Sequence, residues 1–166
     1  YIAIGLSGIV FLVWRIKLAD MFIAVAGPVG VMITGTALLT GAIWGKPTWG
    51  AFWVWDARTT SVLVLFFLYV GLVALRSAIP RTEQASRAVA ILSIVGTVNI
   101  PIIKYSVDWW LTLHQPASFS LTGAPSMPPE MWAPLLVNML GLYCFVAGSI
   151  LADLRNEILE RENETK

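Results

Sequence analysis

The chain has 166 residues, a formal net charge of +1 and one cysteine. Hydrophobic residues make up 57% of it and charged residues 13%, and the mean hydropathy is +0.75. Such values lie outside the range of ordinary soluble domains, and the small, balanced charge argues against a nucleic-acid partner. We therefore expect an integral membrane protein in a lipid bilayer: an all-α, polytopic transmembrane helical bundle that forms a single domain over residues 1–166.

Five apolar runs follow one another along the chain, and each predicts a helix. A helix that crosses a bilayer needs about 20 apolar residues. The first run, residues 1–14, is shorter than this, whereas the second, residues 21–44, contains no charged side chain. Each of the last three runs ends at a charged residue; these runs cover residues 59–75, 88–103 and 131–152. Because the sequence starts at Tyr1 without a methionine and is already apolar there, we expect the first helix to be the second half of a longer one in a longer protein.

The distribution of Lys and Arg predicts the orientation of the bundle. Eight of the eleven lie in the links 15–20 and 76–87 and in the tail of residues 153–166. Cytoplasmic segments of membrane proteins carry this excess of positive charge. We therefore expect a cytoplasmic tail and, on the outer face, residues 44–58 and 104–130, which in a bacterial inner (plasma) membrane means the periplasm.

A few residues within the apolar runs interrupt their pattern. Pro28 and Pro101 each lack an amide donor and should kink their helices unless neighbours satisfy the freed carbonyls. Asn99 needs a buried hydrogen-bond partner. A polar residue within a membrane helix more often bonds to a neighbouring helix than lines a path for a solute or ion. Cys144 has no second cysteine with which to form a disulfide or a thiolate metal site, so we expect a small buried apolar residue.

The densest cluster of aromatic residues lies between the second and third runs. Residues 44–58, here called the aromatic segment, read WGKPTWGAFWVWDAR and hold half of the eight tryptophans: Trp44, Trp49, Trp53 and Trp55. Tryptophan is enriched at membrane interfaces without any ligand, but an interfacial belt distributes its rings over several helix ends. The concentration in one link favours a platform on which a flat apolar ligand stacks.

Three polar residues on the same face could act with this platform. Asp56 is a candidate N-cap that would accept a hydrogen bond from the amide of Thr59. Arg58 could pair with a ligand carboxylate or anchor its helix among lipid headgroups. His114, the only histidine, lies in residues 104–130, here called the histidine segment, and imidazole is a common axial ligand of haem iron.

Both segments resemble motifs of one protein family. The aromatic segment resembles the tryptophan-rich "WWD" signature of haem-handling proteins. Residues 99–115, which read NIPIIKYSVDWWLTLHQ, resemble the C-terminal half of the haem exporter protein C (CcmC) family of cytochrome c maturation proteins. The resemblance extends from about Trp14 to the tail. Phe52 stands where many relatives have another tryptophan, and Thr59 where leucine is common.

The resemblance implies a fold of six helices in the full-length protein and a haem b site at the periplasmic face. Family members bind haem on the tryptophan motif with two external histidines. His114 matches the second of these and would be a metal ligand, whereas the first is expected before Tyr1. The resemblance further implies a role for Trp44, Trp49, Trp53, Trp55, Asp56, Arg58 and His114 in cofactor binding.

The same resemblance implies a trafficking role and no catalysis by protein side chains. Similar proteins load haem onto a periplasmic haem chaperone, which supplies c-type cytochrome biogenesis. They do so in a complex with a small single-helix membrane protein and an ABC transporter made of an ATPase and a membrane subunit.

Two alternatives stay open. The chain could be a fragment of a larger synthetase-type relative that carries the same motif and itself promotes attachment of haem to cytochrome c. It could instead be a permease subunit, with Asn99 and the proline kinks lining a solute path.

Overall fold

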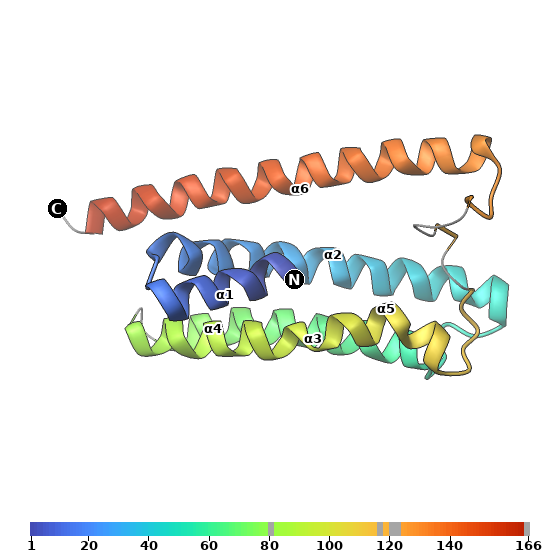
Figure 1. The fold of residues 1–166 in the computed structure, drawn as a ribbon, viewed down its shortest axis with the longest axis horizontal. Helices are drawn as coiled ribbons and strands as arrows, with labels where there is room; N and C mark the ends of the chain where they lie inside the picture. The colour runs from blue at the N-terminus through green and yellow to red at the C-terminus, as the bar shows by residue number, and fades with distance from the viewer. Residues whose placement is uncertain (80–81, 116–117, 120–123, 165–166) are drawn as a thin grey trace.

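The computed structural model describes residues 1–79, 82–115, 118–119 and 124–164, and every regular element in these ranges is helical (Figure 1). The parts of the histidine segment at 116–117 and 120–123 and the last two residues of the predicted tail lie outside the described residues. The helices are α1 (Ile2–Trp14), α2 (Lys17–Trp49), α3 (Ala57–Ala78), α4 (Glu83–Thr97), α5 (Asn99–Trp109) and α6 (Pro129–Glu164).

The described helices contain four stretches that are long and apolar enough to cross a membrane. These stretches are α2, α3, α4 together with α5, and the part of α6 up to Asn163. The all-α, polytopic membrane bundle predicted from the sequence is thereby confirmed. Helix α1 is apolar but shorter than the other spans, as its run of residues predicted.

Several helices are longer than the apolar runs that predicted them. The run predicted over residues 21–44 lies inside α2, which passes through Pro28 and Pro47 without interruption. The run over 131–152 lies inside α6, which continues as a helix through most of the predicted tail. A hydrogen bond of 2.7 Å from Arg161 Nε to Glu157 Oε1, one turn apart, stabilises that polar part of α6.

One predicted helix is divided in two. Helix α4 ends at Thr97 and α5 begins at Asn99, so the run predicted over 88–103 contains a junction. Pro101 lies in the first turn of α5, where a missing amide donor is tolerated. Because Pro101 has no N–H, the carbonyl of Thr97 cannot receive a helical bond from it, which favours a restart of the helix here.

Asn99 has the buried partner that the sequence required. Its Nδ2 donates a hydrogen bond of 2.8 Å to the main-chain oxygen of Ser61. The bond joins α5 to α3, so the interpretation of Asn99 as a contact between helices is confirmed.

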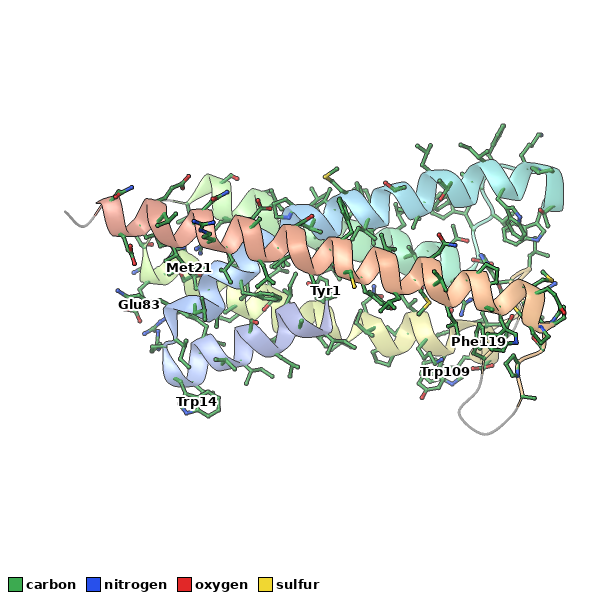
Figure 2. The ribbon with its side chains drawn as sticks, turned by 90° about the horizontal axis from the view of Figure 1, so that it is seen from above. Tyr1, Trp14, Met21, Glu83, Trp109 and Phe119 are labelled. Carbon is green, nitrogen blue, oxygen red and sulfur yellow. The ribbon has the colours of Figure 1, made fainter. Side chains whose placement is uncertain are left out.

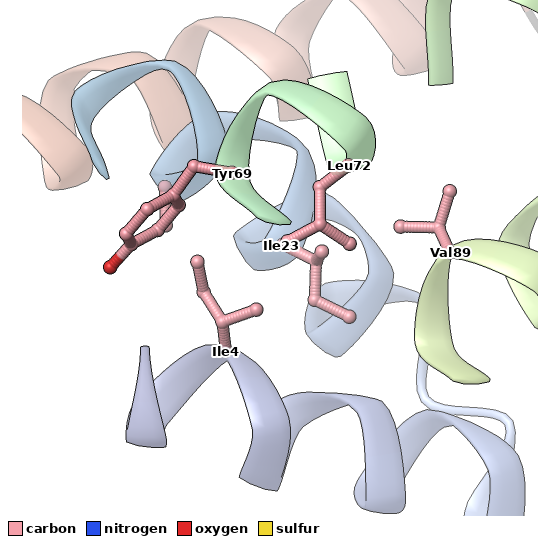
Figure 3. Packing of buried hydrophobic residues seen from close by; sticks show 6 residues of the cluster. Ile4, Ile23, Tyr69, Leu72 and Val89 are labelled. Atoms are coloured by element: carbon pink, nitrogen blue, oxygen red, sulfur yellow. The ribbon is translucent and has the colours of Figure 1, made fainter. Parts of the chain in front are cut away.

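The hydrophobic core lies where α1, α2, α3 and α4 meet (Figure 3). Each of these helices contributes to one buried cluster, which consists of Ile4, Ile23, Ala26, Tyr69, Leu72 and Val89. The close approach of α2 and α3 depends on Gly30, because a Cβ at this position would lie 2.0 Å from the ring of Tyr69. Small residues at such contacts let membrane helices pack backbone to backbone.

A buried ion pair joins α2 and α3 at one end of the bundle. Arg76 donates two hydrogen bonds to Asp20, of 2.7 Å to Oδ1 and 2.6 Å to Oδ2. Arg161, near the end of α6, approaches the same Oδ2 at 3.3 Å. Asp20 is only 4% exposed, so a single carboxylate connects three helices.

Helix α6 lies beside α2 along the outside of the bundle (Figure 1). None of its described side chains is buried within the chain. Cys144, which belongs to this helix, is therefore exposed, and the expectation that it would be buried was wrong. In a membrane, lipid or other helices would cover this apolar surface.

Candidate functional site

The aromatic segment and the histidine segment meet at one end of the bundle. The rings of Trp49 and His114 are 4.7 Å apart, edge to face, and His114 Nδ1 lies 2.7 Å from Asp56 Oδ2. Figure 2 places Trp109 at this end and Trp14 at the opposite one. The prediction that both segments lie on the same side of the membrane agrees with these contacts.

The first half of the aromatic segment is the end of a helix and the second half is a loop. Helix α2 continues through Trp49 and ends at Gly50, whose φ of 80° is one that glycine adopts without strain. The amide of Gly50 donates to the carbonyl of Lys46 at 3.0 Å, and Lys46 Nζ donates to the carbonyl of Gly50 at the same distance. These bonds explain why the helix extends beyond the last apolar residue of its run.

The tryptophan side chains form two pairs. Trp44 and Trp49 project from the last turns of α2 with ring centroids 5.3 Å apart. Trp53 and Trp55 lie in the loop with centroids 5.4 Å apart. Both pairs are edge to face, and Trp55 is 75% exposed. The structure thus leaves aromatic surface open on both halves of the segment.

Asp56 occupies the centre of the site. Its Oδ1 accepts a hydrogen bond of 2.7 Å from the amide of Thr59 and caps α3, as the sequence predicted. Its Oδ2 accepts hydrogen bonds from Thr112 and His114. Burial alone would raise the pKa of Asp56, but the hydrogen bonds from Thr112, Thr59 and His114 outweigh it and lower the pKa to about 2. The carboxylate is therefore ionised at neutral pH.

Two polar groups of the aromatic segment are buried without a hydrogen-bond partner among the described residues. They are Nε1 of Trp53 and Nε of Arg58. Buried donors of this kind are rare in folded proteins and are candidates for contact with an absent group. Arg58 does not pair with Asp56 in the structure, although the two are close in sequence.

Sequence reasoning missed Thr112. Its hydroxyl contacts Asp56 Oδ2 and lies 3.2 Å from His114 Nδ1, and it accepts a hydrogen bond of 3.1 Å from the amide of His114. The only signal in the sequence is its position two residues before the histidine, which is compatible with a turn closed by a threonine hydroxyl.

More aromatic surface lies next to the site. The rings of Tyr105 and Trp109 are stacked at 5.4 Å, and Trp110 packs against Trp109 at 5.8 Å. Both tryptophans are at least half exposed. Tyr105 and Trp109 belong to the last turns of α5 and Trp110 follows them, so the aromatic surface extends beyond the residues predicted to bind a ligand.

Within the described ranges, no group of three or more His, Cys, Asp or Glu side chains could hold a metal ion by itself. A metal at this site would need ligands from elsewhere, as iron in a porphyrin has. The residues present suit such a group, because they combine one imidazole, open indole faces and buried donors that have no partner in the described part of the chain.

Comparisons with known proteins identify the family of the chain. The model of the family described as "Heme exporter protein C" matches residues 1–166. The chain belongs to the haem exporter protein C family.

Three relatives show the extent of the similarity. The haem exporter protein C of Bradyrhizobium diazoefficiens is 51% identical over 150 residues, which are 90% of this chain and 57% of the relative. That of Escherichia coli K12 is 45% identical over 162 residues, 98% of this chain and 65% of the relative. A "putative cytochrome c biosynthesis ccmC-like mitochondrial protein" of Marchantia polymorpha is 40% identical over 159 residues, 96% of this chain and 67% of the relative. The chain thus spans about three-fifths of the length of the first two haem exporter proteins C.

Proposed function

We propose that this chain is the haem-binding part of a membrane protein that presents haem b at the periplasmic face and passes it to a haem chaperone for c-type cytochrome biogenesis. The contact of Asp56 with His114, beside the ring of Trp49, is the observation that carries the proposal. The names of the relatives, haem exporter protein C and a cytochrome c biosynthesis protein, support the same class of function.

Each side chain of the site would contact a different part of the haem. His114 would ligate the iron, and the indoles of Trp44, Trp49, Trp53 and Trp55 would pack against the apolar macrocycle. Arg58, whose Nε is buried without a partner in the described part of the chain, would bind a propionate. Haem supplies the iron and the flat apolar surface, and the protein supplies position and exclusion of water.

The proposed role is transfer rather than catalysis. A site for transfer must hold its cargo well enough to load and weakly enough to release. Much of the aromatic surface is open to solvent, so a chaperone could reach a haem bound there. We propose that the full-length protein works in a complex with a small single-helix membrane protein and an ABC-type ATPase and its membrane subunit.

The absorption spectrum of the full-length protein tests haem binding. The parent, His114→Ala and Gln115→Ala should be purified together, with haem content measured as the pyridine haemochrome. Gln115 follows His114 in the sequence, is exposed, and serves as the control. We expect a Soret band in the parent and in Gln115→Ala, and a lost or shifted band in His114→Ala. Identical spectra for all three proteins would exclude ligation by His114, and haem-free parent protein would favour a permease.

Transfer is tested with the haem chaperone. Haem-loaded protein is mixed with the apo-chaperone, and the haem on each partner is measured after separation. A variant that combines Arg58→Ala with Trp53→Ala should retain less haem and transfer less. If this variant transfers as much haem to the chaperone as the parent does, haem does not pass over the tryptophan platform on its way to the chaperone.

A further inference from the structure

Asp56 has no free oxygen with which to contact a ligand. Oδ1 accepts from the amide of Thr59, and Oδ2 accepts from Thr112 and His114. The side chain is only 6% exposed. A carboxylate so enclosed acts on a ligand only through the groups that it holds.

The group that Asp56 holds most directly is the imidazole of His114. An ionised carboxylate only accepts hydrogen bonds, so the 2.7 Å contact requires the proton of the imidazole to lie on Nδ1. In the neutral imidazole, the second nitrogen, Nε2, then keeps its lone pair. The ring of Trp49, 4.7 Å away and inclined by 68°, limits rotation of the imidazole. Tautomer and ring direction are thus both determined by neighbours.

Thr112 completes this arrangement from the backbone side. Its hydroxyl has one proton, which it gives to Asp56, and its lone pairs accept from the amide of His114 at 3.1 Å. The residue therefore fixes the main chain that carries the imidazole and the carboxylate that orients it. Threonine and serine can both do this, whereas valine has the same shape as threonine but lacks the hydroxyl.

We propose that Asp56 and Thr112 are positioning residues that hold His114 as the Nδ1–H tautomer with Nε2 directed at the ligand. For iron, this proposal rests on the proposed function. Histidine ligands of metals commonly donate their other N–H to a carboxylate, which fixes the ring and strengthens its donation to the metal. Asp56 and Thr112 would thus set both the affinity for haem and the preference for ferric iron.

The tautomer of His114 is measured on haem-free, full-length protein, so this test does not depend on haem binding. The protein is labelled with ¹⁵N-histidine, and the signals of His114 are identified by their loss in His114→Ala. Nitrogen shifts distinguish a protonated from a bare Nδ1. We expect the Nδ1–H tautomer in the parent and in Thr112→Ser, and a mixture in Thr112→Val. Thr40→Val is the matched control, because the bonds of the Thr40 hydroxyl within the described residues go to carbonyls of its own helix.

Either of two results would overturn the proposal: an Nε2–H tautomer in the parent, or the parent's tautomer unchanged in Thr112→Val. The parent measurement stands even where a variant fails to fold.

The haem-loaded protein gives a second readout. Asp56→Asn keeps a residue that caps helices well, but it replaces the charge next to His114 with a neutral amide. We expect a more positive reduction potential of the bound haem and several-fold weaker binding, with Thr112→Val changed in the same direction and Thr112→Ser close to the parent. An unchanged potential in Asp56→Asn would refute the positioning role. Loss of the proposed function itself shows separately, as a His114→Ala spectrum equal to that of the parent.

Discussion

Replacement of Asp20 by alanine tests whether a single carboxylate holds three helices together. Asp20 is 4% exposed and receives both terminal nitrogens of Arg76, at 2.7 and 2.6 Å. Arg161 adds a longer contact from α6, at 3.3 Å. Without the carboxylate, the guanidinium of Arg76 would keep, among its partners in the described part of the chain, the hydroxyl of Ser86 at 3.2 Å.

Removal of one partner from a buried ion pair costs about 3–5 kcal/mol, because the other charge remains buried and unpaired. The lower end of this range applies here. Asp20, Arg76 and Arg161 line a cavity of about 760 Å³, and water that enters it would solvate the remaining guanidinium. Arg161 also keeps its bond to Glu157, at 2.7 Å. A loss of about 3 kcal/mol corresponds to a fall of roughly 6–12 °C in melting temperature for a protein of this size.

Thermal unfolding of the full-length protein in detergent, followed by tryptophan fluorescence, measures the effect. Asp153→Ala is the matched control, since Asp153 is exposed on α6, and it should change the melting temperature by no more than about 2 °C. The double variant Asp20→Leu with Arg76→Met should be more stable than Asp20→Ala, because it leaves no unpaired guanidinium in place of the pair. If Asp20→Ala unfolds at the same temperature as Asp153→Ala, the pair does not stabilise this end of the bundle.

Three further substitutions test other contacts. Gly30→Leu should lower the melting temperature by several degrees, because even a Cβ at this position would lie 2.0 Å from the ring of Tyr69; an unchanged temperature would show that α2 and α3 do not pack this closely. Asn99→Leu removes the 2.8 Å bond to α3 and should cost about 0.5–1.5 kcal/mol in chemical unfolding, the net contribution of one hydrogen bond; a loss near zero would contradict that role. Trp49→Ala should reduce haem content by removing the ring 4.7 Å from the imidazole, whereas Trp14→Ala, at the opposite end, should not; equal content in both would exclude Trp49 from the site.

The sequence predicted the helices but not where they end. Hydropathy detects apolar runs: four of the five runs became one helix each, and the run over residues 88–103 became α4 and α5. It does not detect polar residues that continue a helix, and here such residues extend α2 to Trp49 and α6 to Glu164. Local bonds decide these ends, among them the contacts of Gly50 with Lys46. The junction between α4 and α5 was visible in the sequence only as the expected effect of Pro101.

The site was predicted as a set of residue types, not as an arrangement. Asp56 and His114 were each candidates, one as a helix cap and the other as an iron ligand. Their contact spans 58 positions of the chain, and no local pattern indicates a bond over such a distance. Thr112 was missed because a threonine near a histidine is common, and only the fold places its hydroxyl against the carboxylate of Asp56.

The two halves of the aromatic segment have different backbones, and this gives the site a direction. Trp44 and Trp49 stand on the last turns of a membrane-spanning helix, whereas Trp53 and Trp55 stand on irregular chain. A haem bound as proposed would contact both a part of the chain that helical hydrogen bonds hold and a part that has no such bonds. If haem enters and leaves past the loop, the end of α2 and the imidazole of His114 keep their positions for the next haem. A protein that binds and releases haem repeatedly benefits from such an arrangement, because only the loop part of its site has to rearrange in each round.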